Sequence, residues 1–132
     1  MRKLLLLIPL ALLLAGCGGT SGGTGSPNQG HLGEQAGLVG TTLTLILKDF
    51  TITPAKVTLP KAGTYTIVAW NEGSQLHSLK IQGNGLNVKG TQIGFGKKMT
   101  FTADFKKAGT YQMYCPVIGH RALGMSGTIT VK

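Results

Sequence analysis

The sequence predicts an all-β protein, built as an antiparallel β-sandwich of seven to eight short strands. Short segments alternate apolar and polar side chains and are separated by Gly, Pro and Asn, which is typical of strands joined by turns. The composition is rich in glycine, with 21 of 132 residues, and poor in charge, with 13% Asp, Glu, Lys and Arg. That mixture favours a turn-rich β fold over a helical bundle. No window has the period of an amphipathic helix.

The expected strands follow one another from residue 41 to the end of the chain. They span residues 42–47, 50–53, 56–59, 64–70, 77–81, 98–105, 111–115 and 127–132. In two of them the alternation places a set of side chains on one face, Met99, Phe101, Ala103 and Phe105 in one strand and Tyr111, Met113 and Cys115 in the other. A core of this kind is large enough for one domain.

One short sequence occurs twice, as residues 61–65 and 107–111, both Lys-Ala-Gly-Thr-Tyr. Each copy precedes an expected strand, so Gly supplies the turn and Thr-Tyr begins the strand. Two copies are too few for a repeat architecture.

The first residues have the features of an export signal. A basic start, Met1-Arg2-Lys3, precedes an apolar run over residues 4–14 that is too short to span a bilayer. The run ends in Leu14-Ala15-Gly16-Cys17, which resembles the bacterial lipobox. We therefore expect residues 1–16 to be a lipoprotein signal peptide and Cys17 to carry the lipid. The alternative is an ordinary signal peptide with an incidental cysteine.

Three segments are expected along the chain. Residues 1–16 form the signal peptide, residues 17–40 the lipidated Cys17 and a flexible Gly/Ser/Thr-rich linker, and residues 41–132 the folded domain. His31 lies in the linker and is interpreted as a solvated side chain. The expected location is outside the cytoplasm, on a membrane facing the periplasm or the extracellular side.

The charge balance restricts the partners. The whole chain has a net charge of +9, and loss of residues 1–16 leaves 11 basic and 4 acidic side chains, a net charge of +7. The lysines are scattered, so they form either a solvated surface or a field that steers an acidic partner. Nucleic acid is excluded as a partner because the protein is exported and has no nucleic-acid motif.

Cys115 has no disulfide partner within the mature chain if Cys17 carries lipid. A lone thiol in an exported protein is an inert buried residue, an intermolecular disulfide or a metal ligand. Its neighbours favour the metal ligand, because His120 and Met125 follow at intervals of five residues within one loop. Thiolate, imidazole and thioether ligands together select copper, and His77 is the candidate for a fourth ligand.

Residues 41–132 resemble the cupredoxins, the blue-copper family of plastocyanin and azurin. The motif Cys115-Pro-x-x-Gly-His120-x-x-x-Gly-Met125 carries the resemblance, and its spacing is similar to that of auracyanin and rusticyanin. The segment from Asn71 to His77 matches the region of the family's first histidine. The resemblance implies a Greek-key antiparallel β-sandwich with one copper that cycles between Cu(I) and Cu(II).

The resemblance also implies roles for individual residues. His77, Cys115 and His120 would form a trigonal ligand set, and Met125 would be a weak axial ligand. Ser78 would donate a hydrogen bond toward the thiolate and so help to set the potential. A docking patch for redox partners would comprise Pro116, Val117, Ile118, His120, Arg121 and Leu123, although Val117 and Ile118 are alternatively simple loop packing.

The expected function is therefore a monomeric single-electron carrier that is not an enzyme. Its partners would be cytochromes or oxidase and reductase complexes, with acidic docking faces. Copper enzymes of this family need further histidines, and the chain has only three, of which two are already assigned. The alternatives are a lipoprotein that binds and delivers copper and a purely structural lipoprotein.

Overall fold

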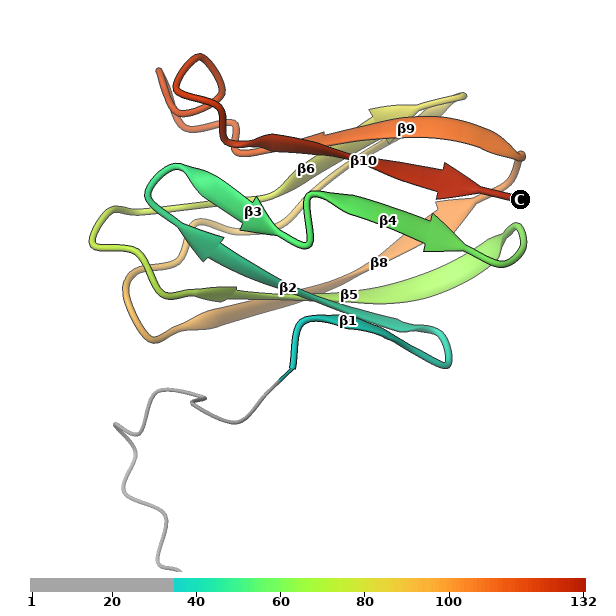
Figure 1. Cartoon of the computed structure of the whole chain (residues 1–132), viewed down its shortest axis with the longest axis horizontal. Coiled ribbons are helices and arrows are strands. Elements are labelled where there is room, and N and C mark those ends of the chain that lie inside the picture. Colours follow the sequence, from blue (N-terminus) through green and yellow to red (C-terminus); the bar gives the residue numbers. More distant parts are fainter. Residues whose placement is uncertain (1–34) are drawn as a thin grey trace, which may run out of the picture.

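The computed structural model describes residues 35–132. The predicted signal peptide, Cys17, which is predicted to carry the lipid, and His31 in the predicted linker lie outside the described residues. Within them the chain forms two five-stranded sheets packed face to face, with no helix (Figure 1). The strands are β1 (Gly37–Val39), β2 (Thr42–Lys48), β3 (Thr51–Thr53), β4 (Lys56–Leu59), β5 (Gly63–Asn71), β6 (Lys80–Gly83), β7 (Leu86–Lys89), β8 (Lys98–Phe105), β9 (Gly109–Tyr114) and β10 (Ser126–Val131).

The all-β sandwich is confirmed, but its sheets are mixed rather than wholly antiparallel. One sheet has the order β1-β2-β5-β8, with β3 paired to β2, and the other has the order β4-β10-β9-β6-β7. β2 runs parallel to β5, and β4 runs parallel to β10. Alternation reports which face of a strand is buried but carries no information on the direction of its neighbour, so the sequence did not reveal these parallel pairs.

Two of the ten strands were not expected. β1 pairs with β2 inside the range that the sequence assigned to the linker, so ordered structure begins before the expected boundary at residue 41. β7 forms a hairpin with β6 through Asn84, whose φ of 48° places it in the left-handed region. Both strands are short and lie at the edges of their sheets, which explains their weak sequence pattern.

The core lies between the sheets and uses the faces that the alternation predicted. In β8, Met99, Ala103 and Phe105 are buried and Phe101 is partly buried, while the intervening residues are exposed. In β9, Tyr111 and Met113 are buried, and Cys115 continues the same face beyond the end of the strand. The buried face of β9 therefore carries Cys115 into the interior.

The two repeated segments form equivalent corners. The hydroxyl of Tyr65 donates to the carbonyl of Lys61 at 2.9 Å, and that of Tyr111 donates to the carbonyl of Lys107 at 2.7 Å. Both tyrosine rings meet Phe105 edge to face. The repeated sequence therefore forms the same hydrogen bond from tyrosine to a carbonyl at the start of β5 and at the start of β9, which lie in opposite sheets.

The opposite end of the sandwich collects the loops that follow β5 and β9. The loop over residues 115–125, between β9 and β10, lies at the same end as the segment over residues 71–79 that follows β5 (Figure 1, left). His77 and Ile93 form an isolated bridge there. Within residues 35–132, no helix has the length and apolar character needed to cross a bilayer.

Candidate metal centre

Three of the four predicted ligands come together at the loop end of the sandwich. The Nδ1 atoms of His77 and His120 are 3.2 Å apart, and the Cys115 sulfur lies 3.9 Å from the first and 3.6 Å from the second. A metal ion held at about 2.1 Å from nitrogen and about 2.3 Å from sulfur separates its donor atoms by about 3.4 to 3.8 Å. The three donor atoms thus lie within a few tenths of an ångström of that spacing.

The donor triangle is closed to water. His77 and Cys115 have no exposed surface, and His120 is 6% exposed. The Nδ1 atoms of His77 and His120 and the sulfur of Cys115 face one another in the interior, and an ion held between them would accept the lone pairs of all three. In the part of the chain that the structure describes, this is the one group of His, Cys and acidic side chains whose donor atoms converge in this way.

Backbone hydrogen bonds hold the ligands in place. The amide of His77 donates to the carbonyl of Ile93, and the amide of Ile93 donates back. The amide of Cys115 donates to Met125, and the amide of Met125 donates to the carbonyl of His120. These backbone bonds link the segments that carry the four predicted ligands and help to hold them in place.

Met125 is wholly buried, and its backbone is bonded to both Cys115 and His120. The tight turn that returns the chain to Met125 contains Gly119 and Gly124, which have φ of 85° and 101°. Such backbone angles favour glycine, which explains why both glycines stand between the ligand positions. With Met125, the donor types at this end of the sandwich are two imidazoles, a thiolate and a thioether, the combination that suits copper.

The environment of His120 disfavours its charged form. Burial is the main factor that lowers the pKa of His120, and the nearby His77 lowers it further, while Asp49 acts in the opposite sense. The ring of Phe50 also packs edge to face on His120, with centroids 4.9 Å apart. A neutral imidazole is the form that binds a metal ion.

Asp49 is a site residue that the sequence analysis missed. Its Oδ1 lies 2.7 Å from Nε2 of His77, the ring nitrogen that faces away from the other ligands. The hydroxyl of Ser74 is the main factor that holds the pKa of Asp49 well below its usual range, with His77 contributing further. In the sequence, an acid at the end of a strand has the pattern of a solvated turn residue. The contact of Asp49 with His77 becomes visible only in the fold, which brings Ser74 and His77 next to it.

Ser78 directly follows His77 in the sequence and is buried. Its hydroxyl donates to the carbonyl of Gly90 at 2.9 Å, which is a different acceptor from the Cys115 thiolate that the sequence suggested. An influence of Ser78 on the potential therefore stays a prediction, and it would act through the bond to Gly90, which holds the backbone next to His77.

The residues predicted for partner docking differ widely in exposure. Ile118 is 98% exposed and Leu123 is 62% exposed, whereas Val117 packs against the core. Arg121 is exposed, but its guanidinium stacks over the ring of Tyr114 at 4.1 Å. Pro116 is partly buried and His120 presents only a narrow edge to solvent.

Two further apolar side chains are exposed in the segments around His77. Leu76, which directly precedes His77, is 56% exposed, and Phe95 is 72% exposed. The segments that carry them are bonded together, because the amide of Gly96 donates to the carbonyl of Asn71. Isolated apolar residues within polar loops give no sequence pattern, and their shared location appears only in the fold.

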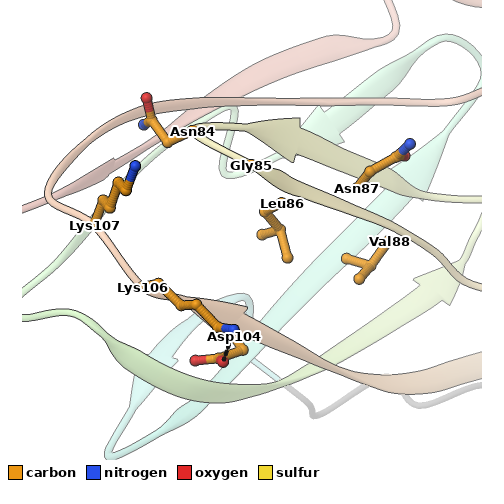
Figure 2. Close-up of a pocket in the computed structure, with 8 residues that line it drawn as sticks. All are labelled: Asn84, Gly85, Leu86, Asn87, Val88, Asp104, Lys106 and Lys107. Atoms are coloured by element: carbon orange, nitrogen blue, oxygen red, sulfur yellow. Dashed lines mark ion pairs between the residues drawn. The ribbon is translucent and has the colours of Figure 1, made fainter.

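A shallow concavity of about 490 Å³ lies away from the donor triangle, between the β6–β7 hairpin and the end of β8 (Figure 2). It is lined by Asn84, Gly85, Leu86, Asn87, Val88, Asp104, Lys106 and Lys107. Lys106 pairs with Asp104 at 3.9 Å, and the side-chain amide of Asn84 donates to the carbonyl of Thr110. These side chains are exposed or partly exposed, so the concavity has the character of a hydrated surface.

Comparison with solved structures gives the same fold. Auracyanin from the photosynthetic bacterium Roseiflexus castenholzii, in its dithionite-reduced form, matches with a TM-score of 0.63 and 21% identity, over 70% of this chain and 98% of that chain. Auracyanin B matches with a TM-score of 0.62 and 16% identity, over 69% and 88%. Auracyanin A, a blue copper protein from the green thermophilic photosynthetic bacterium Chloroflexus aurantiacus, matches with a TM-score of 0.57 and 18% identity, over 69% and 99%.

No curated protein sequence matches the chain. A family model, however, the cupredoxin-like domain, matches residues 32–131, which is most of the chain. The match begins before β1, in agreement with the early start of the ordered domain. With its mixed β-sandwich and its buried His-Cys-His triangle, the chain belongs to the family of cupredoxin-like domains.

Proposed function

We propose that this protein is a single-electron carrier with one mononuclear type 1 copper site. The observation that carries the proposal is the buried triangle formed by Nδ1 of His77, Nδ1 of His120 and the sulfur of Cys115. Two histidines and a cysteine with a weak methionine ligand form the ligand pattern of electron-transfer copper centres. Bound copper would supply the redox chemistry, gaining and losing one electron between Cu(II) and Cu(I).

The chain contributes a fixed and dry ligand set. His77, Cys115 and His120 would hold the ion, with Met125 as a weaker fourth ligand. The backbone bonds that join Met125 to Cys115 and His120 resist rearrangement of the loop when the charge of the site changes. A site that hardly moves between its two states needs little reorganisation, which favours fast electron transfer.

Burial of the donors favours electron transfer over the alternative of copper delivery. Transfer of copper to another protein requires the acceptor's ligands to reach the ion while the donor's ligands leave. His77 and Cys115 have no exposed surface, so an acceptor cannot approach them without opening the domain. An electron needs no such opening, since the edge of His120 reaches the surface.

Docking is proposed to take place around His120. Ile118 and Leu123 project from the loop beside it, and Leu76 and Phe95 project from the segments around His77. A small apolar surface suits brief association, because it can be desolvated without binding tightly. The net positive charge of the chain favours redox proteins with acidic faces.

The proposal includes export and membrane anchoring through Cys17, supported by the lipobox-like sequence Leu14-Ala15-Gly16-Cys17. We expect the full-length protein made in a bacterial host to sediment with membranes, whereas Cys17→Ser releases it or leaves it unprocessed. Fractionation with mass spectrometry of the N-terminal peptide checks this. An unmodified Cys17 in the membrane fraction would contradict the anchor.

Copper titration followed by voltammetry tests the proposed function. We expect one copper per chain, a reversible one-electron wave, and loss of both in Cys115→Ser. The matched control is Met113→Leu, since Met113 is buried in β9 but is not among the proposed ligands. A protein that binds copper without a reversible wave would instead be a copper-handling protein.

A further inference from the structure

The ring of His77 is held at both nitrogens. Its Nδ1 faces His120 and Cys115, and its Nε2 lies 2.7 Å from Oδ1 of Asp49. An ionised carboxylate can only accept hydrogen bonds, so Nε2 carries a proton, and in the neutral ring Nδ1 then keeps its lone pair. The contact with Asp49 thus selects the tautomer in which Nδ1 is free to bind a metal ion.

The carboxylate of Asp49 is itself held by the segment that leads to His77. The backbone amide of Ser74 donates to Oδ2 at 2.8 Å, the hydroxyl of Ser74 donates to the same oxygen, and the amide of Gln75 donates to Oδ1 at 3.3 Å. With Nε2 of His77, four hydrogen-bond donors therefore hold the partly exposed carboxylate of Asp49. A carboxylate held in this way has a fixed position and a stabilised negative charge.

Asn71 shapes the segment that supplies these donors. Its side-chain oxygen accepts from the amide of Gly73 at 2.8 Å, and its side-chain nitrogen donates to the carbonyls of Gln75 and Ile93, both at 2.8 Å. Asn71 is wholly buried, so these bonds are protected from water. The turn is rigid where it meets Asp49.

Gly73 leaves just enough room for the contact. A Cβ atom at this position would collide with Oδ1 of Asp49 and would lie 2.7 Å from Nε2 of His77. The φ of Gly73 is not in the left-handed region, so close approach rather than backbone conformation accounts for the glycine. Three features of the turn, Asn71, Gly73 and Ser74, therefore converge on one hydrogen bond between Asp49 and His77.

We propose that Asp49 is a positioning residue that fixes the orientation and tautomer of His77 and lowers the reduction potential of the copper site. The inference rests on the proposed copper function. A negative charge behind the imidazole raises its strength as a donor. It also stabilises the more positive ion, Cu(II), more than it stabilises Cu(I). Removing the charge while keeping the shape of the side chain should raise the potential.

The central variant is Asp49→Asn, and its matched control is Asp104→Asn, which removes an exposed carboxylate from β8. Removal of such an outer partner lowers metal affinity by about tenfold or more. We expect Asp49→Asn to lower the ratio of Cu(II) to Cu(I) affinity about tenfold, equal to a rise of about 59 mV for a one-electron couple. The potential of Asp104→Asn should stay close to that of the unsubstituted protein.

Ser74→Ala provides a change of opposite sign and a safeguard against misfolding of the first variant. It keeps the carboxylate but removes one donor to it, which leaves more negative charge facing His77. The potential should therefore fall. If the potentials of Asp49→Asn and Ser74→Ala both equal that of Asp104→Asn, the inference is overturned.

A measurement on the metal-free protein separates this inference from the proposed function. Nitrogen-15 NMR of the imidazoles should show His77 protonated at Nε2 in the unsubstituted protein and a mixture of tautomers in Asp49→Ala. This result does not need copper, so it stands even if the protein is not an electron carrier. A His77 tautomer that is unchanged in Asp49→Ala would refute the positioning role.

Discussion

The nearly buried His120 makes the metal-free protein sensitive to pH. Burial and the neighbouring His77 lower its pKa from 6.5, so the unfolded chain binds a proton more readily than the folded chain. The stability that the neutral form of His120 contributes is therefore fully present above pH 6.5. It is lost as the pH falls through the lowered pKa of His120 in the folded chain. The lowered pKa of Asp49 has the same sign but acts only below pH 3.8, the ordinary value of its carboxyl.

We therefore predict that the urea concentration at the unfolding midpoint of the metal-free protein decreases as the pH is lowered from about 7.5 to about 5. The replacement His120→Gln removes the titrating group and should flatten this part of the curve. Denaturation curves at several pH values, followed by tryptophan fluorescence, provide the measurement. A midpoint of the unsubstituted protein that does not change over this range would contradict the account of His120.

Individual side chains also show where sequence reasoning succeeds. Cys115, His120 and Met125 were recognisable because their spacing within one loop is unusual for those residue types. Asp49 and Phe50 were not, since their contacts with His77 and His120 join segments far apart in the chain. Short-range pattern predicts a ligand loop, whereas the residues that orient the ligands depend on the tertiary fold.

At the scale of strands and turns, the two Lys-Ala-Gly-Thr-Tyr corners should matter for stability but not for the site. Tyr65 and Tyr111 each donate from a buried ring to a backbone carbonyl, and both contact Phe105. We predict that Tyr65→Phe and Tyr111→Phe each lower the free energy of unfolding by about 1 kcal/mol. Tyr114→Phe is the control, because its hydroxyl bonds to the side chain of Gln82.

Chemical denaturation measures these differences, and the redox potential of each variant should stay unchanged. The corners lie at the end of the sandwich away from the residues 115–125 loop (Figure 1). If Tyr111→Phe is as stable as the unsubstituted protein, the hydrogen bond from Tyr111 to the carbonyl of Lys107 does not stabilise the corner.

The strands illustrate the same limit at the scale of elements. β8 and β9 were predicted closely because each has one buried and one largely exposed face. β1 and β7 are short edge strands with weak alternation, so the sequence did not reveal them. The mixed direction of the sheets depends on how the chain crosses between layers, which alternation does not encode.

For the molecule as a whole, positive charge should govern encounters with redox partners. Lys97 and Lys98 are exposed at the start of β8, close to the segments that flank His77. We predict that oxidation of the reduced protein by ferricyanide, an anion, slows several-fold as salt rises from about 10 mM to about 150 mM, because the Debye length falls from about 30 to about 8 Å. Stopped-flow absorption provides the rates.

Two variants locate this effect on the surface. Lys97→Gln should slow the reaction at low salt more than Lys107→Gln, since Lys107 lies in the turn at the far end of the sandwich. Equal effects of the two substitutions would mean that net charge alone steers the oxidant, with no preferred face.

The most direct test of the account is a visible absorption spectrum of the protein loaded with Cu(II), followed by addition of ascorbate. If Cys115 binds copper as a thiolate beside His77 and His120, the protein will be intensely blue, bleach on reduction and regain its colour on oxidation. Cys115→Ser will remove the colour. A Cu(II) protein without an intense visible band would contradict the copper–thiolate site and with it the proposed electron transfer.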